Sequence, residues 1–476
     1  MDPEATTMTY DTTETERTPH PWRWRILGFL GVAQLMLILD VTVVAIALPH
    51  IETDLGASRE ALTWTVSAYA LAFGGLMLLG GRLADLIGAK RVVLAGLVIF
   101  TAASLATGLA PSSGLLLGGR IAQGVGAALL SPAALSLVVT LFDGDERNKA
   151  LGVWSALGGG GAALGVLLGG ALTAGPGWPW VFFVNVPIGL VILVALIRLL
   201  PRQAAAAPRA RLDVLGALLV TASTGTLIYA FISAGDGGWL TAVTGLLVVL
   251  AALGYLVFAL WQRRAASPLM DVRLLARRPV ATGTFLILLA TALMIAVFFL
   301  GTFYFQHARG YGALRTGLLF LPVALATMAG ANLTGRAIAR VGARPLAVIG
   351  LLVAAAGMAA PAVSMHPATV VAGVSVAAAG TGALFVVASA TALGQVAPHE
   401  AGIASGIVST FHEFGAAGGA AVVSSVAAAS LVGDTLSGFT RGFAAGAVAA
   451  GVAALVAAVL TPRKPEAFRK SRTTGA

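Results

Sequence analysis

The sequence predicts an all-α integral membrane protein, and two observations carry this prediction. Hydrophobic residues make up 58% of the 476 residues, and the mean hydropathy is +0.91. Apolar runs of about 18 residues or more recur along the chain, and each could cross a hydrocarbon core of about 30 Å as a helix. A soluble protein of this length has too small an interior to bury so many such runs.

We place fourteen spans, each ending where polar or glycine-rich residues interrupt an apolar run. They cover residues 26–48, 61–81, 92–110, 114–140, 150–173, 180–200, 212–234, 239–261, 281–306, 314–338, 345–363, 367–394, 401–430 and 440–461. Because the number is even, both termini lie on one side of the membrane.

The basic residues separate by side under this topology. Of the 30 Lys and Arg, 25 fall on the side of the termini, 4 fall on the other side and one, Arg120, lies inside a span. Positive residues remain cytoplasmic, so we expect a multi-pass plasma-membrane protein with both termini in the cytoplasm. The net charge of +10 therefore reflects topology and does not indicate a nucleic-acid partner.

The basic segments also predict the domain boundaries. We expect a disordered cytoplasmic tail (1–25), an N-terminal six-helix bundle (26–200), basic linkers with the seventh and eighth helices (201–280), a C-terminal six-helix bundle (281–461) and a basic cytoplasmic tail (462–476). The two bundles are related, because "GRLADLIGAK" (81–90) aligns without gaps on "GRAIARVGAR" (335–344) at an offset of 254 residues. Two related halves around a central cavity are a transporter architecture.

The first of these turns concentrates charge in a chain that is only 11% charged. Gly81 and Gly88 allow a tight reversal, and Asp85 can pair with Arg82 or with the N-terminus of a neighbouring helix. We predict a conformational latch that comprises Gly81, Arg82, Asp85, Gly88, Lys90 and Arg91. The alternative is that Arg82, Lys90 and Arg91 only keep this turn in the cytoplasm.

Four motifs carry a resemblance to a known family. "GGRLADLIGAKR" (80–91) resembles the loop between helices two and three of the major facilitator superfamily, and "LDVTVVAIALPHI" (39–51) resembles the first-helix signature of its fourteen-helix drug–proton antiporter branch. "RIAQGVGAALLSP" (120–132) and "GGGGAALGVLLGG" (158–170) resemble its fourth-helix motif and its fifth-helix antiporter motif. The resemblance implies two pseudo-symmetric six-helix bundles plus two extra central helices.

The sequence departs from these motifs at two positions. Ala45 stands where the first-helix signature has Asn, and Val166 stands where the fifth-helix motif has Pro. The glycines of that motif are Gly161, Gly165, Gly169 and Gly170. The first three repeat every four residues, which gives a smooth face either for permanent packing or for sliding during transport.

Ionisable residues inside the membrane are costly and mark functional sites. Asp40 and Arg120 lie at similar depths in spans one and four, so we predict a buried pair that is either structural or, as the resemblance implies, part of proton coupling. Glu413 lies near the middle of span thirteen with His412 beside it, about 100° away around the helix. We name Asp40, Arg120, Glu413 and His412 as candidates for proton coupling, with binding of a cationic substrate as the alternative for Glu413. The residues Gln34, Gln123 and Asn332 are candidates to line a polar cavity, with hydrogen bonding between helices as the alternative.

No pattern of catalysis is present. The sequence has no cysteine, no GxxxxGK[ST] and no HExxH, so we expect no enzyme activity, no metal site and no cofactor. The sequence favours a monomeric, proton-driven exporter of small amphipathic molecules, such as drugs or antibiotics, with the lipid bilayer as its surroundings. The alternatives are a proton-coupled importer, a facilitator, and a sensor or scaffold that transports nothing.

Overall fold

A computed structural model describes residues 21–200, 212–270, 272–394, 401–428 and 436–461. Most of the predicted tails, and the basic segment 201–211, lie outside the described residues. The helices are α1 (Arg23–Leu55), α2 (Arg59–Ile87), α3 (Ala89–Gly108), α4 (Ser113–Leu141), α5 (Gly144–Ala174), α6 (Trp180–Phe183), α7 (Asn185–Leu199), α8 (Val214–Gly237), α9 (Ala242–Arg264), α10 (Val272–Ala276), α11 (Arg278–Phe303), the π-helix η1 (Tyr304–Ala308), α12 (Ala313–Leu319), α13 (Leu321–Val341), α14 (Ala343–Val363), α15 (Pro367–Leu393), α16 (Ala401–Val426) and α18 (Ser437–Leu460). No strand occurs within the described residues.

Twelve helical stretches in the described chain are long and apolar enough to cross a membrane. The predicted number of fourteen is therefore not confirmed. The two remaining predicted spans correspond to α5 and α16, which are 31 and 26 residues long. In α5 the apolar stretch found covers only Leu164–Ala174, and α16 carries His412 and Glu413, which lower its hydropathy.

The first helix begins earlier and ends later than predicted. It starts at Arg23, inside the predicted disordered tail, and ends at Leu55 instead of residue 48. Its first turn is anchored because Arg23 Nε and Nη2 donate to the two carboxylate oxygens of Glu146 at 2.9 and 3.0 Å. Gly56 closes the other end with a left-handed φ of 57°. Below, the terminal side is the side on which α1 begins, and the opposite side is the side on which it ends.

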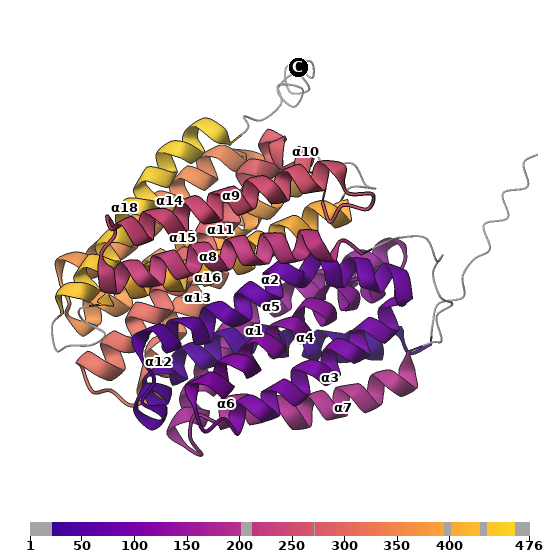
Figure 1. Ribbon diagram of the computed structural model, residues 1–476, viewed down its shortest axis with the longest axis horizontal. Coiled ribbons are helices and arrows are strands. Elements are labelled where there is room, and N and C mark those ends of the chain that lie inside the picture. The colour runs from indigo at the N-terminus through magenta and orange to yellow at the C-terminus, as the bar shows by residue number, and fades with distance from the viewer. Residues whose placement is uncertain (1–20, 201–211, 271, 395–400, 429–435, 462–476) are drawn as a thin grey trace, which may run out of the picture.

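The helices pack in two groups with the same pattern. In the first group, α1 to α7, α4 packs on α2 and α3 while α1 packs on α5; in the second group, α11 to α18, α15 packs on α13 and α14 while α11 packs on α16. The groups meet where α2 packs on α16 and where α5 packs on α12 and α13. Figure 1 shows the indigo and purple first group beside the orange and yellow second group. The repeat seen in the sequence is thus a repeat of helix packing.

The repeated turns have nearly the same backbone conformation. Gly88, between α2 and α3, has φ 95°, and Gly342, between α13 and α14, has φ 93°. Residues other than glycine rarely adopt such angles. The close packing beside the first turn comes from a glycine that we did not predict, since a Cβ on Gly80 would lie 2.1 Å from the carbonyl oxygen of Ala128, whereas one on Gly81 would lie 3.7 Å from Pro132.

The two extra helices are peripheral, although they are central in the sequence. α8 packs on α2 and α16 along the boundary of the groups, and α9 packs mainly on α8 (Figure 1). The outward side of α9 is apolar and exposed, as at Leu246, Val249 and Leu253. This position suits a helix whose outer surface faces lipid.

Candidate functional site

The structure brings Asp40 of α1 and Arg120 of α4 together as an ion pair. Arg120 Nη1 donates to Asp40 Oδ2, and each residue is only 1% exposed. Asp40 lies 15 residues before the end of α1, or about 23 Å at 1.5 Å per residue. The pair is therefore placed well inside the span.

Three amide and hydroxyl side chains surround this pair. Gln123 accepts from Arg120 Nη1 at 3.0 Å and donates to Asp40 Oδ1 at 3.1 Å and to Ser104 Oγ at 2.8 Å. Asn185 of α7 also donates to Asp40 Oδ1, at 3.4 Å. Gln123 thus belongs to this cluster, and it does not line the cavity described below. Asn185 and Ser104 were not predicted, although both are polar residues inside predicted spans.

The guanidinium of Arg120 is held from the other side by α2. Its Nε donates to the carbonyl oxygen of Thr65 at 2.8 Å, and its Cζ lies 4.3 Å from the centre of the Tyr69 ring. The same Cζ lies 5.9 Å from the centre of the Phe182 ring, which comes from α6. A backbone carbonyl and two aromatic rings can hold a cation while its carboxylate partner changes charge.

Glycines in α4 place Arg120 at this point. A Cβ on Gly124 would lie 2.6 Å from the carbonyl oxygen of Tyr69, and one on Gly126 would lie 2.6 Å from the amide nitrogen of Phe100. α4 therefore packs in backbone contact with α2 and α3. This contact brings a long side chain from α4 into the middle of the first group.

A second acidic site lies at the seam between α2 and α16. Glu413 is 7% exposed, and its Oε1 lies 3.1 Å from Nδ1 of His412. Our expectation that these two side chains point apart was wrong, because adjacent long side chains can bend toward each other from a helix surface. Glu413 packs tightly here, since a Cβ on Gly74 would lie 2.6 Å from its Cβ.

The residues of the predicted latch are placed on the terminal side. Among the described residues, neither Arg82 nor Asp85 has a hydrogen-bond or ion-pair partner, and Asp85 and Arg91 are exposed. Lys90 donates to the carbonyl oxygens of Leu200 and Ile197 at the end of α7. Lys90 thus stabilises the first group itself.

The glycines of α5 divide between two neighbours. A Cβ on Gly161 would lie 2.8 Å from Ile38, one on Gly165 would lie 1.9 Å from Thr42, and one on Gly169 would lie 3.0 Å from Val43, so these three pack on α1 within the first group. Gly170 instead faces α12 of the second group, where its Cβ would lie 2.9 Å from the carbonyl oxygen of Ala313. Gly170 alone among the four lies on a surface between the groups.

The sequence of the chain matches a known protein family. The profile of the Major Facilitator Superfamily matches residues 30–420. The chain belongs to the major facilitator superfamily. It is 40% identical over 422 residues to the puromycin resistance protein pur8 of Streptomyces alboniger, covering 86% of this chain and 82% of that protein. It is 36% identical to the cephamycin export protein CmcT of Amycolatopsis lactamdurans, with 83% of each chain covered.

Solved structures show the same fold at low sequence identity. A bacterial homologue of the human lysosomal transporter Spinster, in an inward-facing and occupied conformation, gives a TM-score of 0.66 at 16% identity, over 95% of this chain and 97% of that chain. A peptide transporter, POT, in complex with sulfate gives a TM-score of 0.64 at 16% identity, over 94% and 95%.

In this major facilitator protein, several polar contacts between the two groups lie toward the opposite side. Arg59 donates to Ser424 Oγ at 3.2 Å, and Thr63 donates to the same oxygen at 2.6 Å. Gln306 donates to the carbonyl oxygen of Ile46 at 2.9 Å. On the terminal side, by contrast, Asn332 of α13 is exposed. These contacts join the two groups on the opposite side.

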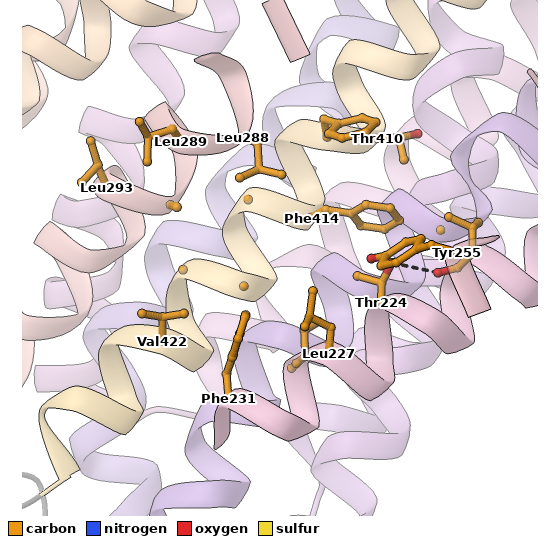
Figure 2. Close-up of a pocket in the computed structure, with 18 of the residues that line it drawn as sticks. Thr224, Leu227, Phe231, Tyr255, Leu288, Leu289, Leu293, Thr410, Phe414 and Val422 are labelled. Carbon is orange, nitrogen blue, oxygen red and sulfur yellow. Dashed lines mark hydrogen bonds between the residues drawn. The ribbon is translucent and has the colours of Figure 1, made fainter. Parts of the chain in front are cut away.

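The remaining predicted polar residues have different positions. Gln34 of α1 is part-buried, and its Oε1 has no hydrogen-bond partner among the described atoms. Neither Gln34 nor Asn332 lines the cavity of about 630 Å³ shown in Figure 2. That cavity lies between α8, α9, α11, α16 and α18, away from the Asp40–Arg120 pair.

Proposed function

We propose that this chain is a proton-coupled exporter of small amphipathic molecules, such as drugs or antibiotics. The observation that carries the proposal is the buried Asp40–Arg120 pair in a member of a transporter superfamily. Relatives named for puromycin resistance and cephamycin export support the direction and the substrate class. The family of transporters uses gradients as its energy source, so the proposal requires no metal and no cofactor.

Asp40 is the proposed proton carrier. When it takes a proton, the carboxyl loses its charge, while Arg120 keeps its bonds to Thr65 and Gln123. Breaking a buried ion pair by neutralising one partner costs about 3–5 kcal/mol. Moving a two-state equilibrium from 1:99 to 99:1 takes about 5.5 kcal/mol, and protonation of Asp40 drives the proposed cycle by as much as the two states differ in proton affinity. Glu413 with His412 is the second proposed proton site.

The proposed cycle alternates access between the two bundles, residues 26–200 and 281–461. With both termini in the cytoplasm, the terminal side is cytoplasmic, and the contacts of Arg59 and Gln306 close the extracellular side. We propose that this state is the one closed on the extracellular side. The latch around Asp85 is proposed to form its contact in the other state, when the cytoplasmic side closes, and Gln34 and Asn332 are proposed to line the central path.

The proposed topology has fourteen spans, with α5 and α16 as the two beyond the twelve. Both helices are long enough, since about 20 residues span the hydrocarbon core. Both also pack among the spans, α5 on α1 and α16 on α11. Glu413 lowers the hydropathy of α16 because its side chain is ionisable, and its proposed proton role accounts for its presence in a span. We further propose that the monomer in the plasma membrane is the working unit.

One observation favours a second candidate, a proton-coupled importer. Val166 occupies the position at which the resembled antiporter motif has proline, and its carbonyl oxygen would lie 2.7 Å from a Cβ on Gly317. The direction of transport distinguishes the importer from the exporter.

The test is accumulation of a fluorescent drug such as ethidium in drug-sensitive bacteria that express the protein. An exporter lowers accumulation of the drug in the cells. At equal membrane abundance, Asp40→Asn should restore accumulation to the level of cells that carry the empty vector. Asp54→Asn serves as the control, because Asp54 lies near the end of α1 and accepts from Trp178 at 2.8 Å, away from Arg120. Higher accumulation in expressing cells would favour import, and an unchanged Asp40→Asn phenotype would contradict the proton role.

A further inference from the structure

A cavity of about 630 Å³ lies apart from the Asp40–Arg120 pair, which is inside the first group. Its walls come from α8 and α9 on one side and from α11, α16 and α18 on the other, with a short contribution from α2 and the α9–α11 connection. Cavities of about 300–1,000 Å³ suit drug-sized ligands. The extra helix pair thus forms a wall of a ligand-sized space.

The cavity is elongated along α16. Thr410, Phe414, Gly418, Val422 and Val426 recur every fourth residue and line it from one helix face (Figure 2). From the first to the last of these, the helix rises about 24 Å at 1.5 Å per residue. A space of this length extends through much of the hydrocarbon core.

Its lining is apolar apart from a few hydroxyl groups. None of the described residues that line it is charged. Thr224 and Tyr255 hydrogen-bond to each other at 2.8 Å, as the dashed line in Figure 2 marks. Thr410 is only 2% exposed, and among the described atoms its buried Oγ1 has no hydrogen-bond partner. An unpaired buried hydroxyl costs about 1–3 kcal/mol, so a ligand that pairs with it gains affinity.

The three hydroxyl groups lie at a similar depth. Each residue stands nine or ten positions from the end of its helix on the terminal side, Thr410 from Ala401, Thr224 from Val214 and Tyr255 from Arg264. This corresponds to about 14 Å along each helix. A phospholipid acyl chain has no group that could hydrogen-bond to Thr410, so it would leave this hydroxyl unpaired.

We propose that this lateral cavity binds an uncharged amphiphile that has a carbonyl or hydroxyl group within an apolar body and that enters from the bilayer. A charged ligand is disfavoured, since no described lining residue could compensate its charge. Entry from the bilayer follows from the packing: α18 packs mainly on α14 and α11, while α9 packs mainly on α8. Extensive packing between α9 and α18 does not occur in the described residues.

The site can be tested by photolabelling purified protein in phosphatidylcholine nanodiscs with a diazirine-bearing analogue of progesterone, an uncharged steroid with carbonyl groups. Adducts are mapped by mass spectrometry of peptides. We expect labelling of α8 and α16 peptides that contain Thr224 and Phe414. Gly418→Leu places a side chain in the cavity, where its Cβ meets no atom within 4 Å, and it should lower labelling at least fivefold.

Gly451→Leu is the matched control, because Gly451 on α18 also has open space around its Cβ but does not line the cavity. Thr410→Val should lower labelling about three- to tenfold, the loss of one hydrogen bond. Ala449→Trp provides a second cavity-filling variant if Gly418→Leu does not give a monodisperse protein.

Two results would overturn the assignment. One is labelling that survives both cavity-filling variants. The other concerns a phospholipid that carries a diazirine in its acyl chain. The assignment fails if this phospholipid labels the same peptides and excess progesterone does not reduce that labelling. Binding needs no proton gradient, so Asp40→Asn should label normally even if it exports nothing. Failure of export and failure of this site are thereby distinguished.

Discussion

Gly170 of α5 and Gly317 of α12 face each other across the boundary between the two helix groups. A Cβ built on Gly170 would lie 3.4 Å from the Cα of Gly317, and one built on Gly317 would lie 3.3 Å from the Cα of Gly170. Backbone thus meets backbone at this point. We propose that this backbone contact is a surface on which one group tilts against the other.

We expect Gly317→Ala to reduce export at least tenfold while the protein remains in the membrane. The added methyl group would lie 2.7 Å from the carbonyl oxygen of Val166, a backbone atom that cannot move aside. Drug accumulation at matched membrane abundance measures the effect. Gly118→Ala is the control, since a Cβ there meets no atom within 4 Å, and equal export by the two variants would contradict a role for this contact.

Asp85 gives a second prediction. It has no hydrogen-bond or ion-pair partner among the described residues, so we propose that the latch forms its contact in the other state. We expect Asp85→Asn to raise labelling of Asn332→Cys by a membrane-impermeant maleimide about two- to fivefold, because an exposed ion pair contributes up to about 1 kcal/mol. The native chain has no cysteine, so the signal comes from one site.

The matched control is Glu60→Gln, at the other end of α2 and also exposed. It should leave labelling of Asn332→Cys unchanged. If Asp85→Asn and Glu60→Gln behave alike, the charges of the turn serve topology only.

A third prediction concerns pH and the start of α1. Hydrogen bonds from Arg23 lower the pKa of Glu146 below its usual value. A lowered folded-state pKa means that the contact stabilises α1 above the ordinary glutamate pKa of about 4.3 and is lost as pH falls through the lowered value. In amide hydrogen exchange, protection of residues 23–28 should therefore persist at pH 7 and fall in acid.

Glu146→Gln should remove most of that protection at every pH. Asp143→Asn should not, because Asp143 pairs with Arg147 of its own segment at 2.7 Å. Protection of residues 23–28 that is insensitive to Glu146→Gln would show that packing alone holds this helix end.

Sequence reasoning located the ion pair of the first group because a charge inside an apolar run is conspicuous. Similar depths in two spans were enough to pair Asp40 with Arg120. It did not find Asn185 or the Thr65 carbonyl, because an amide among apolar residues is common and a backbone group leaves no sequence signal.

Tertiary packing accounts for what the sequence did not predict elsewhere. The offset of 254 residues predicted the matching turns at Gly88 and Gly342. It could not place α8 and α9, whose apolar surfaces fit a central or a peripheral position equally well. Helical spacing set His412 and Glu413 apart, whereas their flexible side chains bring them to 3.1 Å.

The most direct test of the proton-coupled function is proton movement in proteoliposomes that enclose a pH-sensitive dye. With a preset pH gradient, adding a transported amphiphile should dissipate the gradient in the wild-type protein, and Asp40→Asn should abolish the signal while Asp54→Asn retains it. Movement of the labelled amphiphile without any change in pH, in wild-type protein, would contradict proton coupling and leave the Asp40–Arg120 pair as a structural contact.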